Sequence, residues 1–505
     1  MPSLPSSLPR ICVALGMPDT DRLMRAAEAE YKDGSTFLEF RLDYLLDVCN
    51  GVELVESFRK RHPEVQILAT CRHKNNNGHF AGALQRQIEI LKAAAKAGAV
   101  ALDLEIESAE KIKAAVNGLR QEAALIVSYH SFRNTPSPLG VLRRLQRIPA
   151  DAYKLVTTAN KPADALKLTD FLKSYRGVPL ISFGMTEQGL ATRILSPALG
   201  CAFTYAAPST ECGTAPGQIA AKVMRSLYRT DKLSRQTRIY GVIADPVAHS
   251  KSPVIHNRAF QARRMDAVYL PFLVASQHLN EWMRLAQNLP VCGFSVTIPH
   301  KQKIVRYLDV VDPPAKRIGA VNTVWRKAGK WRGTNTDIEG VLRPLRKYVR
   351  IAHSSILIAG YGGAARAAAI ALLDAGAQIT ITGRNIHKAQ QLARALKAEA
   401  VSLKEAETQT YDVLIHATPL GMSPHIEGVI FTDRIPADIV FDMIYNPRET
   451  LLLKNARAQG CTLIYGSEML LAQAACQFEI WTGDSAPRAV MQSALEQSLQ
   501  TSAPV

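Results

Sequence analysis

Short apolar runs alternate with helix-length stretches over the first 225 residues. Eight of these runs are rich in β-branched and aromatic residues and are strand candidates, at 11–15, 36–42, 65–71, 100–107, 124–130, 152–159, 179–185 and 202–208. Each is followed by a helix-sized segment, which is the pattern of parallel strands joined by helices. We therefore predict an α/β protein whose residues 1–224 form a (β/α)8 TIM barrel.

Alternation inside the strands indicates which side chains face the barrel interior. In 100–107 (VALDLEIE) the apolar residues share one face. Asp103, Glu105 and Glu107 share the other face and are expected to point into the barrel. Glu39 and Arg41 in 36–42 are expected to do the same.

A second series of strand and helix patterns follows a basic, polar segment. Residues 225–237 are predicted to be a linker, and new strand candidates begin at 239–246. We assign 238–341, completed by 475–505, to a substrate-binding α/β domain and 342–474 to a Rossmann domain.

Composition narrows the class of protein. The eight cysteines form no CxxC pair, so neither a disulfide framework nor a metal site is expected. No run of 18 apolar residues occurs, so no membrane-spanning helix is expected. The first strand candidate begins about ten residues in, which leaves no room for a signal peptide. We expect a reduced cytoplasmic protein, monomeric or homodimeric.

The formal net charge is +17 and the isoelectric point about 9.5. The basic residues are dispersed, without dense blocks or interleaved aromatic residues, so nucleic acid is not the expected partner. A solvated surface and the steering of small anionic ligands both remain compatible with this charge.

The stretch 355–372 (SILIAGYGGAARAAAIAL) places a G-x-G-x-x-A motif between an apolar strand and an Ala-rich helix. Such glycines let the backbone approach a pyrophosphate at a helix N-terminus. The expected contacts are Gly360, Gly362, Gly363 and Ala364. The next strand ends at Arg384, followed by Asn385 and Lys388, where an acid would hold the ribose of NAD. An arginine favours the 2′-phosphate of NADP, and the alternative is a solvated side chain.

Polar clusters surround this domain, at 249–257, 295–301, 319–324, 333–340, 442–447 and 466–483. A ketone reductase needs hydroxyls and amides to orient a polyol and a proton donor near the carbonyl. Lys301 and Asp337 are the evident ionisable pair. Together, and in this order, the six motifs resemble shikimate dehydrogenase over essentially all of 238–505.

That resemblance implies a role for each matching residue. Lys301 and Asp337 would be the catalytic dyad, with Lys301 donating a proton to the C3 oxygen. The implied substrate contacts are Ser250, Ser252, Thr297, Asn322, Tyr445 and Gln473. Thr418 and Met443 would lie near the nicotinamide of NADP, and Gly466 is a further implied cofactor contact. One departure is Gly383-Arg384-Asn385, where the family usually has Asn-Arg-Thr.

A second set of polar residues lies at or near the carboxyl ends of the predicted barrel strands. His130 ends the fifth strand, and Lys154 lies within the apolar sixth strand. Burial disfavours the charge of a lysine and makes a nucleophilic amine; the alternative is a lysine whose head reaches water. The set resembles type I 3-dehydroquinate dehydratase over about 10–222. It implies a Schiff base at Lys154 and acid–base catalysis by His130. Substrate contacts would be Glu39, Arg41, Arg72, Arg193, Thr214 and Gln218, with Arg193 on the carboxylate.

The dehydration product, 3-dehydroshikimate, is the substrate that the second half would reduce. The sequence therefore predicts a bifunctional enzyme acting on small molecules in aromatic amino-acid biosynthesis. Two alternatives stay open: a catalytically degenerate barrel beside an active dehydrogenase, and a dehydrogenase that prefers quinate.

The loop 70–80 (TCRHKNNNGHF) contains the main departure in the barrel. The dehydratase family commonly has a glutamate four residues after the arginine that matches Arg72, beside the catalytic histidine; here the residue is Asn76. We expect Asn76 to accept a hydrogen bond from His130 and to stabilise its protonated form less well than a carboxylate does.

Overall fold

The computed structural model describes residues 3–208 and 213–500. Contacts between Cα atoms divide the chain into two compact units, residues 1–239 with 270–291, and residues 240–269 with 292–505. No helix among the described residues combines the length and the apolar character needed to cross a lipid bilayer. The predicted domain boundaries stay predictions.

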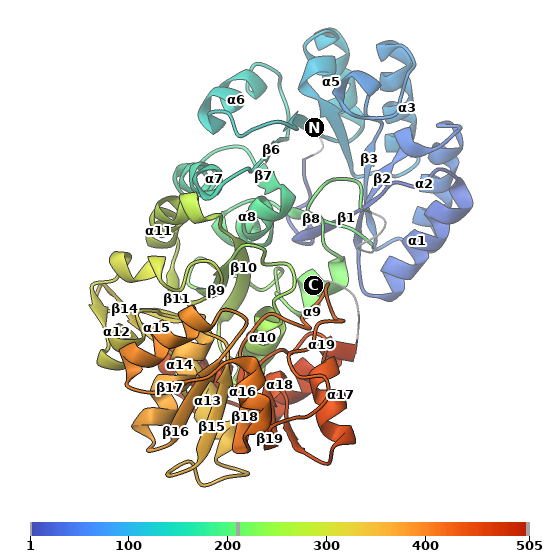
Figure 1. The fold of residues 1–505 in the computed structure, drawn as a ribbon. Coiled ribbons are helices and arrows are strands. Elements are labelled where there is room, and N and C mark those ends of the chain that lie inside the picture. Colours follow the sequence, from blue (N-terminus) through green and yellow to red (C-terminus); the bar gives the residue numbers. More distant parts are fainter. Residues whose placement is uncertain (1–2, 209–212, 501–505) are drawn as a thin grey trace. The chain divides into compact units, whose positions relative to one another are not determined.

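The first unit contains the predicted barrel (Figure 1). Its parallel strands are β1 Ile11–Leu15, β2 Phe37–Arg41, β3 Gln66–Thr70, β4 Ala101–Glu105, β5 Ala124–Ser131, β6 Ala152–Thr158, β7 Leu180–Met185 and β8 Thr204–Ala206. They pair in the order β7-β6-β5-β4-β3-β2-β1-β8, a nearly closed ring.

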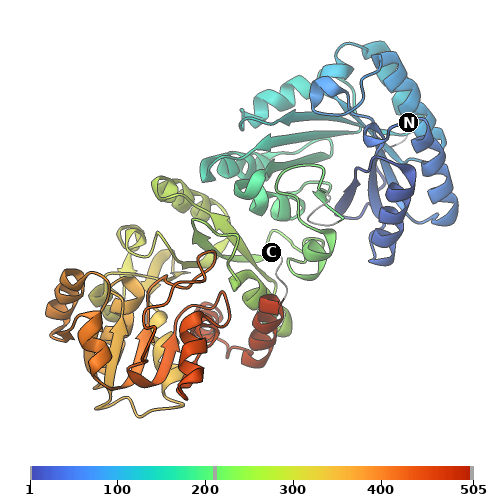
Figure 2. The same cartoon turned by 45° about the vertical axis from the view of Figure 1, so that its right-hand side comes forward.

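Helices cover the outside of these strands, as Figure 2 shows. They are α1 Thr20–Lys32, α2 Asn50–Arg61, α3 Leu84–Lys96, α4 Ile106–Ala109, α5 Lys113–Glu122, α6 Pro138–Leu145, α7 Pro162–Ser174, α8 Thr186–Leu199 and α9 Ala221–Ser226. Two single-turn 3-10 helices, η1 Leu42–Tyr44 and η2 Lys74–Asn76, follow strands β2 and β3.

A mixed six-stranded sheet follows the barrel, in the order β10-β9-β11-β13-β14-β12. Its strands are β9 Arg238–Ala244, β10 Ala267–Leu273, β11 Val291–Val296, β12 Val310–Val311, β13 Thr323–Lys327 and β14 Lys330–Thr334. The accompanying helices are α10 Ser252–Ala262, η3 Ser276–His278, α11 Leu279–Asn288, η4 Lys303–Tyr307, α12 Pro313–Ile318, α13 Asp337–Leu345, α18 Gly466–Thr482 and α19 Arg488–Gln500.

The third sheet is parallel, in the order β17-β16-β15-β18-β19-β20. Its strands are β15 Ser355–Ala359, β16 Gln378–Thr382, β17 Glu399–Ala400, β18 Tyr411–His416, β19 Ala437–Asp442 and β20 Thr462–Ile464, and its helices are α14 Gly363–Asp374, α15 Ile386–Leu396, α16 Leu403–Thr408 and α17 Leu451–Ala458. Ile356 and Ile358 pack in one apolar cluster, and Leu357 and Ala359 in another, so both faces of the sheet are covered. This is the predicted Rossmann architecture.

Candidate active sites

The barrel interior changes from apolar to charged along its strands. Phe37, Ala101 and Ala152 belong to a buried apolar cluster made by the inward residues of all eight strands. Two residues further along the same three strands come Glu39, Asp103 and Lys154, which are also buried. Because side chains in a strand alternate between faces, all of these residues point inward. The charged layer lies closer to the carboxyl ends of the strands than the apolar layer.

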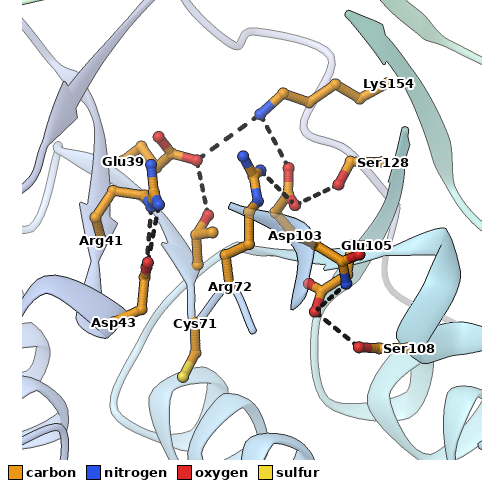
Figure 3. Close-up of polar contacts among 12 residues, drawn as sticks. Glu39, Arg41, Asp43, Cys71, Arg72, Asp103, Glu105, Ser108, Ser128 and Lys154 are labelled. Carbon is orange, nitrogen blue, oxygen red and sulfur yellow. Dashed lines mark hydrogen bonds and ion pairs between the residues drawn. The ribbon is translucent and has the colours of Figure 1, made fainter. Parts of the chain in front are cut away.

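Lys154 lies between two carboxylates and an aromatic ring. Its Nζ is 3.0 Å from Asp103 Oδ2 and 3.9 Å from Glu39 Oε1. Figure 3 draws both contacts as dashed lines. The Nζ is also 3.9 Å from the centre of the Tyr205 ring. The sequence predicted burial of this lysine, and the structure adds two carboxylates that act against the desolvation of its charge.

Asp103 connects Lys154 to a second cation. Its Oδ1 accepts a hydrogen bond from Arg72 at 3.3 Å and another from the Ser128 hydroxyl at 2.7 Å. Burial opposes ionisation of this carboxyl group, but Lys154, Arg72 and Ser128 outweigh burial and lower its pKa. Asp103 is therefore a carboxylate that holds both cations in place.

His130 is half-buried and lines the same cavity. Burial together with the positive charges of Arg72, Lys154 and Arg41 lowers its pKa well below 6.5. Within the described part of the chain its ring makes no hydrogen bond; Phe132 stacks on it with centroids 6.1 Å apart. The imidazole is consequently neutral at neutral pH and able to accept a proton.

Arg193 is a buried cation without a carboxylate partner among the described residues. It comes from the middle of α8 and is 1% exposed. Its guanidinium donates only to the backbone carbonyls of Tyr205 and Pro216, and Nε has no partner. Burial lowers its pKa to about 9. An anionic ligand group would satisfy this charge.

One cavity brings together all eight barrel residues predicted from the sequence. Its other lining residues include Asn77, Phe132 and Tyr205. The prediction missed Tyr205, although it lies two residues after the inward Phe203, and it named Asp103 only as inward-facing. Loop residues have no such periodic signal, so the sequence could not indicate Asn77.

Two expectations about the barrel differ from the structure. Strand β4 ends at Glu105, and Glu107 lies in α4, where it pairs with Arg144 at 3.3 Å instead of pointing inward. Asn76 does not bond to His130. Its Nδ2 donates to Glu105 Oε1 at 3.3 Å. That oxygen also accepts from the His73 backbone, Gln87 and Ser108.

A second polar site lies in the second unit. Lys301 Nζ donates to Asp337 Oδ2 at 2.6 Å, and Asn322 Nδ2 donates to Asp337 Oδ1 at 2.8 Å. Asp337 is the first residue of α13, where the helix dipole favours a carboxylate. Gln473 on α18 reaches Asn322 at 3.5 Å. The predicted dyad is therefore a direct ion pair that Asn322 orients.

The remaining predicted substrate residues come from several elements of the chain. Ser252 begins α10, and its N–H donates to Ser250 Oγ at 3.3 Å. Thr297 directly follows β11 and is half-buried. The backbone at Lys301 is held by a hydrogen bond from the Val321 N–H to the Lys301 carbonyl. Tyr445 follows β19, and burial raises its pKa.

The third sheet has the topology of open parallel sheets that bind a dinucleotide in a crevice at their carboxyl edge. From β15 the chain adds β16 and β17 toward one edge of the sheet, and then β18, β19 and β20 toward the other, and open parallel sheets bind ligands at the carboxyl ends of the strands where this order changes. Gly360 has a φ of +135°, and a Cβ there would lie 2.8 Å from the Ala417 carbonyl oxygen. Gly362 and Gly363 begin α14 and leave open space where a side chain would lie. This arrangement suits a pyrophosphate at a helix N-terminus.

Arg384 follows β16 at one edge of this crevice. Arg384 is exposed and has no carboxylate partner among the described residues. The next residue, Asn385, caps α15. The Nζ of Lys388 lies 5.9 Å from the centre of the Tyr361 ring. A Cβ at Gly383 would lie 3.0 Å from this ring, which gives a physical reason for glycine at that departure from the family pattern.

At the other edge of the crevice lie Thr418, Met443 and Gly466. Thr418 follows β18, and the backbone N–H of Met443 donates to the His416 carbonyl. A Cβ at Gly466 would lie 2.3 Å from the Ile444 carbonyl oxygen, so only glycine fits at the start of α18. A buried pair beside them, His416 and Asp442, has side chains 3.0 Å apart and was not predicted, because no local pattern marks it.

Comparison with known families matches both halves of the chain. Residues 11–235 match the type I 3-dehydroquinase model. Residues 242–324 match the shikimate dehydrogenase substrate binding domain, residues 345–442 match shikimate / quinate 5-dehydrogenase, and residues 466–496 match the shikimate 5′-dehydrogenase C-terminal domain.

Individual proteins agree with these matches. A bifunctional 3-dehydroquinate dehydratase/shikimate dehydrogenase of Arabidopsis thaliana, named as chloroplastic, is 33% identical over 95% of this chain and 83% of its own length. A shikimate dehydrogenase (NADP(+)) of Methanobrevibacter smithii is 40% identical over 53% of this chain and 99% of its own. A crystal structure of a shikimate dehydrogenase in complex with NADP+ has a TM-score of 0.51 and 37% identity, and covers 53% of this chain and 97% of that one. The chain therefore belongs to the family of bifunctional 3-dehydroquinate dehydratase/shikimate dehydrogenases.

Proposed function

We propose that this chain catalyses two consecutive steps of the shikimate pathway. The barrel dehydrates 3-dehydroquinate to 3-dehydroshikimate, and the second unit reduces 3-dehydroshikimate to shikimate with NADPH. The single observation that carries the proposal for the barrel is its cavity, where the buried Lys154 amine, the neutral His130 ring and the unpaired Arg193 charge meet.

In the barrel, Lys154 is the nucleophile. After losing a proton to a neighbouring carboxylate, its amine adds to the C3 ketone, and loss of water gives an imine. His130 removes the C2 proton, and the electron pair delocalises into the imine. His130 then returns a proton to the departing C1 hydroxyl, which leaves as water. Hydrolysis of the imine releases 3-dehydroshikimate and restores Lys154.

Arg193 supports this chemistry by holding the substrate carboxylate. Its buried guanidinium lacks an anionic partner in the described part of the chain, so the carboxylate would complete the site electrostatically. We assign ring hydroxyls to Glu39, Arg41, Arg72, Thr214 and Gln218, which line the same cavity.

In the second unit, Lys301 is the proton donor. We propose that Ser250 and Ser252 bind the substrate carboxylate, while Thr297, Asn322, Tyr445 and Gln473 orient the ring. Lys301 gives its proton to the C3 oxygen as this oxygen gains negative charge, and Asp337 keeps the lysine in position at 2.6 Å. NADPH supplies the hydride when it is bound.

We assign residues of the Rossmann domain to three parts of NADPH: the pyrophosphate, the 2′-phosphate and the nicotinamide. We assign the pyrophosphate to Gly360, Gly362, Gly363 and Ala364 at the start of α14. Arg384, Asn385 and Lys388 would hold the 2′-phosphate, and two of these side chains are exposed cations. Thr418, Met443 and Gly466 would lie at the nicotinamide end, across the crevice from Arg384.

Borohydride trapping tests whether the barrel is an enzyme or only a binding module. Sodium borohydride added with 3-dehydroquinate should reduce the imine and attach the ligand covalently to Lys154, as peptide mass spectrometry would show. Lys154→Ala is the matched control and should give no adduct. An unlabelled wild-type chain would contradict the assignment. A separate assay of untreated protein compares NADP+ reduction with shikimate and with quinate, and tests the preference for shikimate.

We also propose that the chain acts in the cytoplasm as a monomer or homodimer. Light scattering of the purified chain tests the oligomeric state, and a larger assembly would contradict it.

A further inference from the structure

A buried chain of hydrogen bonds ends at the crevice assigned to the cofactor. Strands β18 and β19 pair so that His416 lies beside Asp442. His416 Nδ1 is 3.0 Å from Asp442 Oδ1, and Nε2 is 2.6 Å from Thr418 Oγ1. His416 is 1% exposed and Asp442 is fully buried. Thr418 is half-buried, at the open end of this chain.

The partners of Asp442 determine the direction of each bond. Its Oδ1 also accepts from the Ile444 N–H at 3.0 Å, and its Oδ2 accepts from the Thr450 hydroxyl. A carboxylate has no hydrogen to donate, so His416 Nδ1–H is the donor to Asp442. A ring that carries its one hydrogen on Nδ1 accepts at Nε2, and the Thr418 hydroxyl then donates to it.

With the bonds in this direction, Thr418 can form only one kind of hydrogen bond with a ligand. Its hydrogen is used by His416, and one of its two lone pairs accepts from the Leu420 N–H at 3.2 Å. The remaining lone pair can only accept a hydrogen bond from a ligand. On the nicotinamide half of NADP, the carboxamide N–H2 is a group that can donate but cannot accept.

We propose that His416 is a positioning residue which, together with Asp442, fixes Thr418 as a hydrogen-bond acceptor for the nicotinamide carboxamide. The inference rests on the proposed function, because it needs NADP in the crevice with its nicotinamide on the β18 side. Thr418 follows β18, on the opposite side of β15 from Arg384, which follows β16. His416 and Asp442 would thus act on cofactor recognition without touching the cofactor.

Calorimetric binding to the full chain tests this arrangement without relying on turnover. Two ligands are compared, NADP+ and 3-acetylpyridine adenine dinucleotide phosphate, in which a methyl group replaces the amide nitrogen. The measured quantity is the ratio of their dissociation constants. One hydrogen bond corresponds to a contribution of roughly two- to tenfold to this ratio in the wild type.

Thr418→Val should remove that contribution, whereas Thr418→Ser, which keeps the hydroxyl, should retain it. His416→Phe should reduce it, because the Thr418 hydroxyl is then free to rotate. Thr418→Val and Thr418→Ser keep the proposal testable if His416→Phe does not fold.

An unchanged ratio in Thr418→Val would overturn the inference while leaving NADP+ binding, and thus the proposed function, intact. Failure of the wild type to bind NADP+ would overturn both.

Discussion

At the scale of single residues, the barrel site surrounds one imidazole with cations. Arg72, Lys154 and Arg41 all disfavour a positive charge on His130, and burial does so more strongly. The family's usual carboxylate would act in the opposite direction, but Asn76 stands in its place and bonds to Glu105 instead. His130 is therefore tuned as a base in the free enzyme.

This tuning predicts the pH dependence of dehydration. A general base works in its neutral form, which exists above its pKa. Because that pKa is lowered from 6.5, kcat/KM for 3-dehydroquinate should stay high below pH 6.5 and fall only at more acidic pH. The pH profile of kcat/KM measures this directly. An acidic limb centred at or above 6.5 would contradict a lowered pKa of His130.

Asn76 allows a second prediction at this scale. In Asn76→Glu a carboxylate would replace an amide that lies 3.3 Å from buried Glu105 Oε1. We expect the barrel to lose about 1–3 kcal/mol of stability, measured as a lower urea midpoint for its transition. Repulsion raises the pKa of such a pair, so the loss should shrink as pH falls. Asn76→Gln keeps the donor and is the control; equal midpoints for both variants would contradict the account.

At the scale of elements, strand alternation predicted part of the barrel site, and the positions of strand ends and the family resemblance supplied the rest. Glu39, Asp103 and Lys154 each follow an inward apolar residue by two positions, and the carboxyl ends of parallel strands meet at one rim. Where strands end was not predictable in the same way. Ile106 continues the alternation of β4 but begins α4, so Glu107 turns outward to Arg144. Long-range bonds such as Asn76 to Glu105 have no local signal at all.

Helix α18 offers a prediction about an element. A Cβ at Gly466 would meet the carbonyl oxygens of Ile444 at 2.3 Å and Met443 at 2.6 Å. Gly466→Ala should therefore displace α18 and with it Gln473. We expect at least a tenfold loss of kcat/KM for 3-dehydroshikimate, about 1.4 kcal/mol in transition-state stabilisation. Dehydration should be unaffected. Ser467→Ala, in the same turn, is the control, and normal reduction by Gly466→Ala would contradict the packing argument.

At the scale of the whole molecule, the residues assigned to each active site lie within one compact unit. The barrel cavity uses residues between 39 and 218, all in the first unit. The dehydrogenase and cofactor residues lie within 240–269 and 292–505, all in the second. The two reactions therefore need no shared side chain, and the covalent link supplies the two activities in equal amounts.

The most direct test of this account is a steady-state assay of the purified chain with 3-dehydroquinate and NADPH. Absorbance of the enone product and oxidation of NADPH are followed separately, for wild type and for Lys154→Ala. We predict that wild type oxidises NADPH with 3-dehydroquinate as the only carbon substrate. Lys154→Ala should do so only when 3-dehydroshikimate is supplied. A wild-type chain that oxidises NADPH with 3-dehydroshikimate but not with 3-dehydroquinate would contradict the bifunctional assignment.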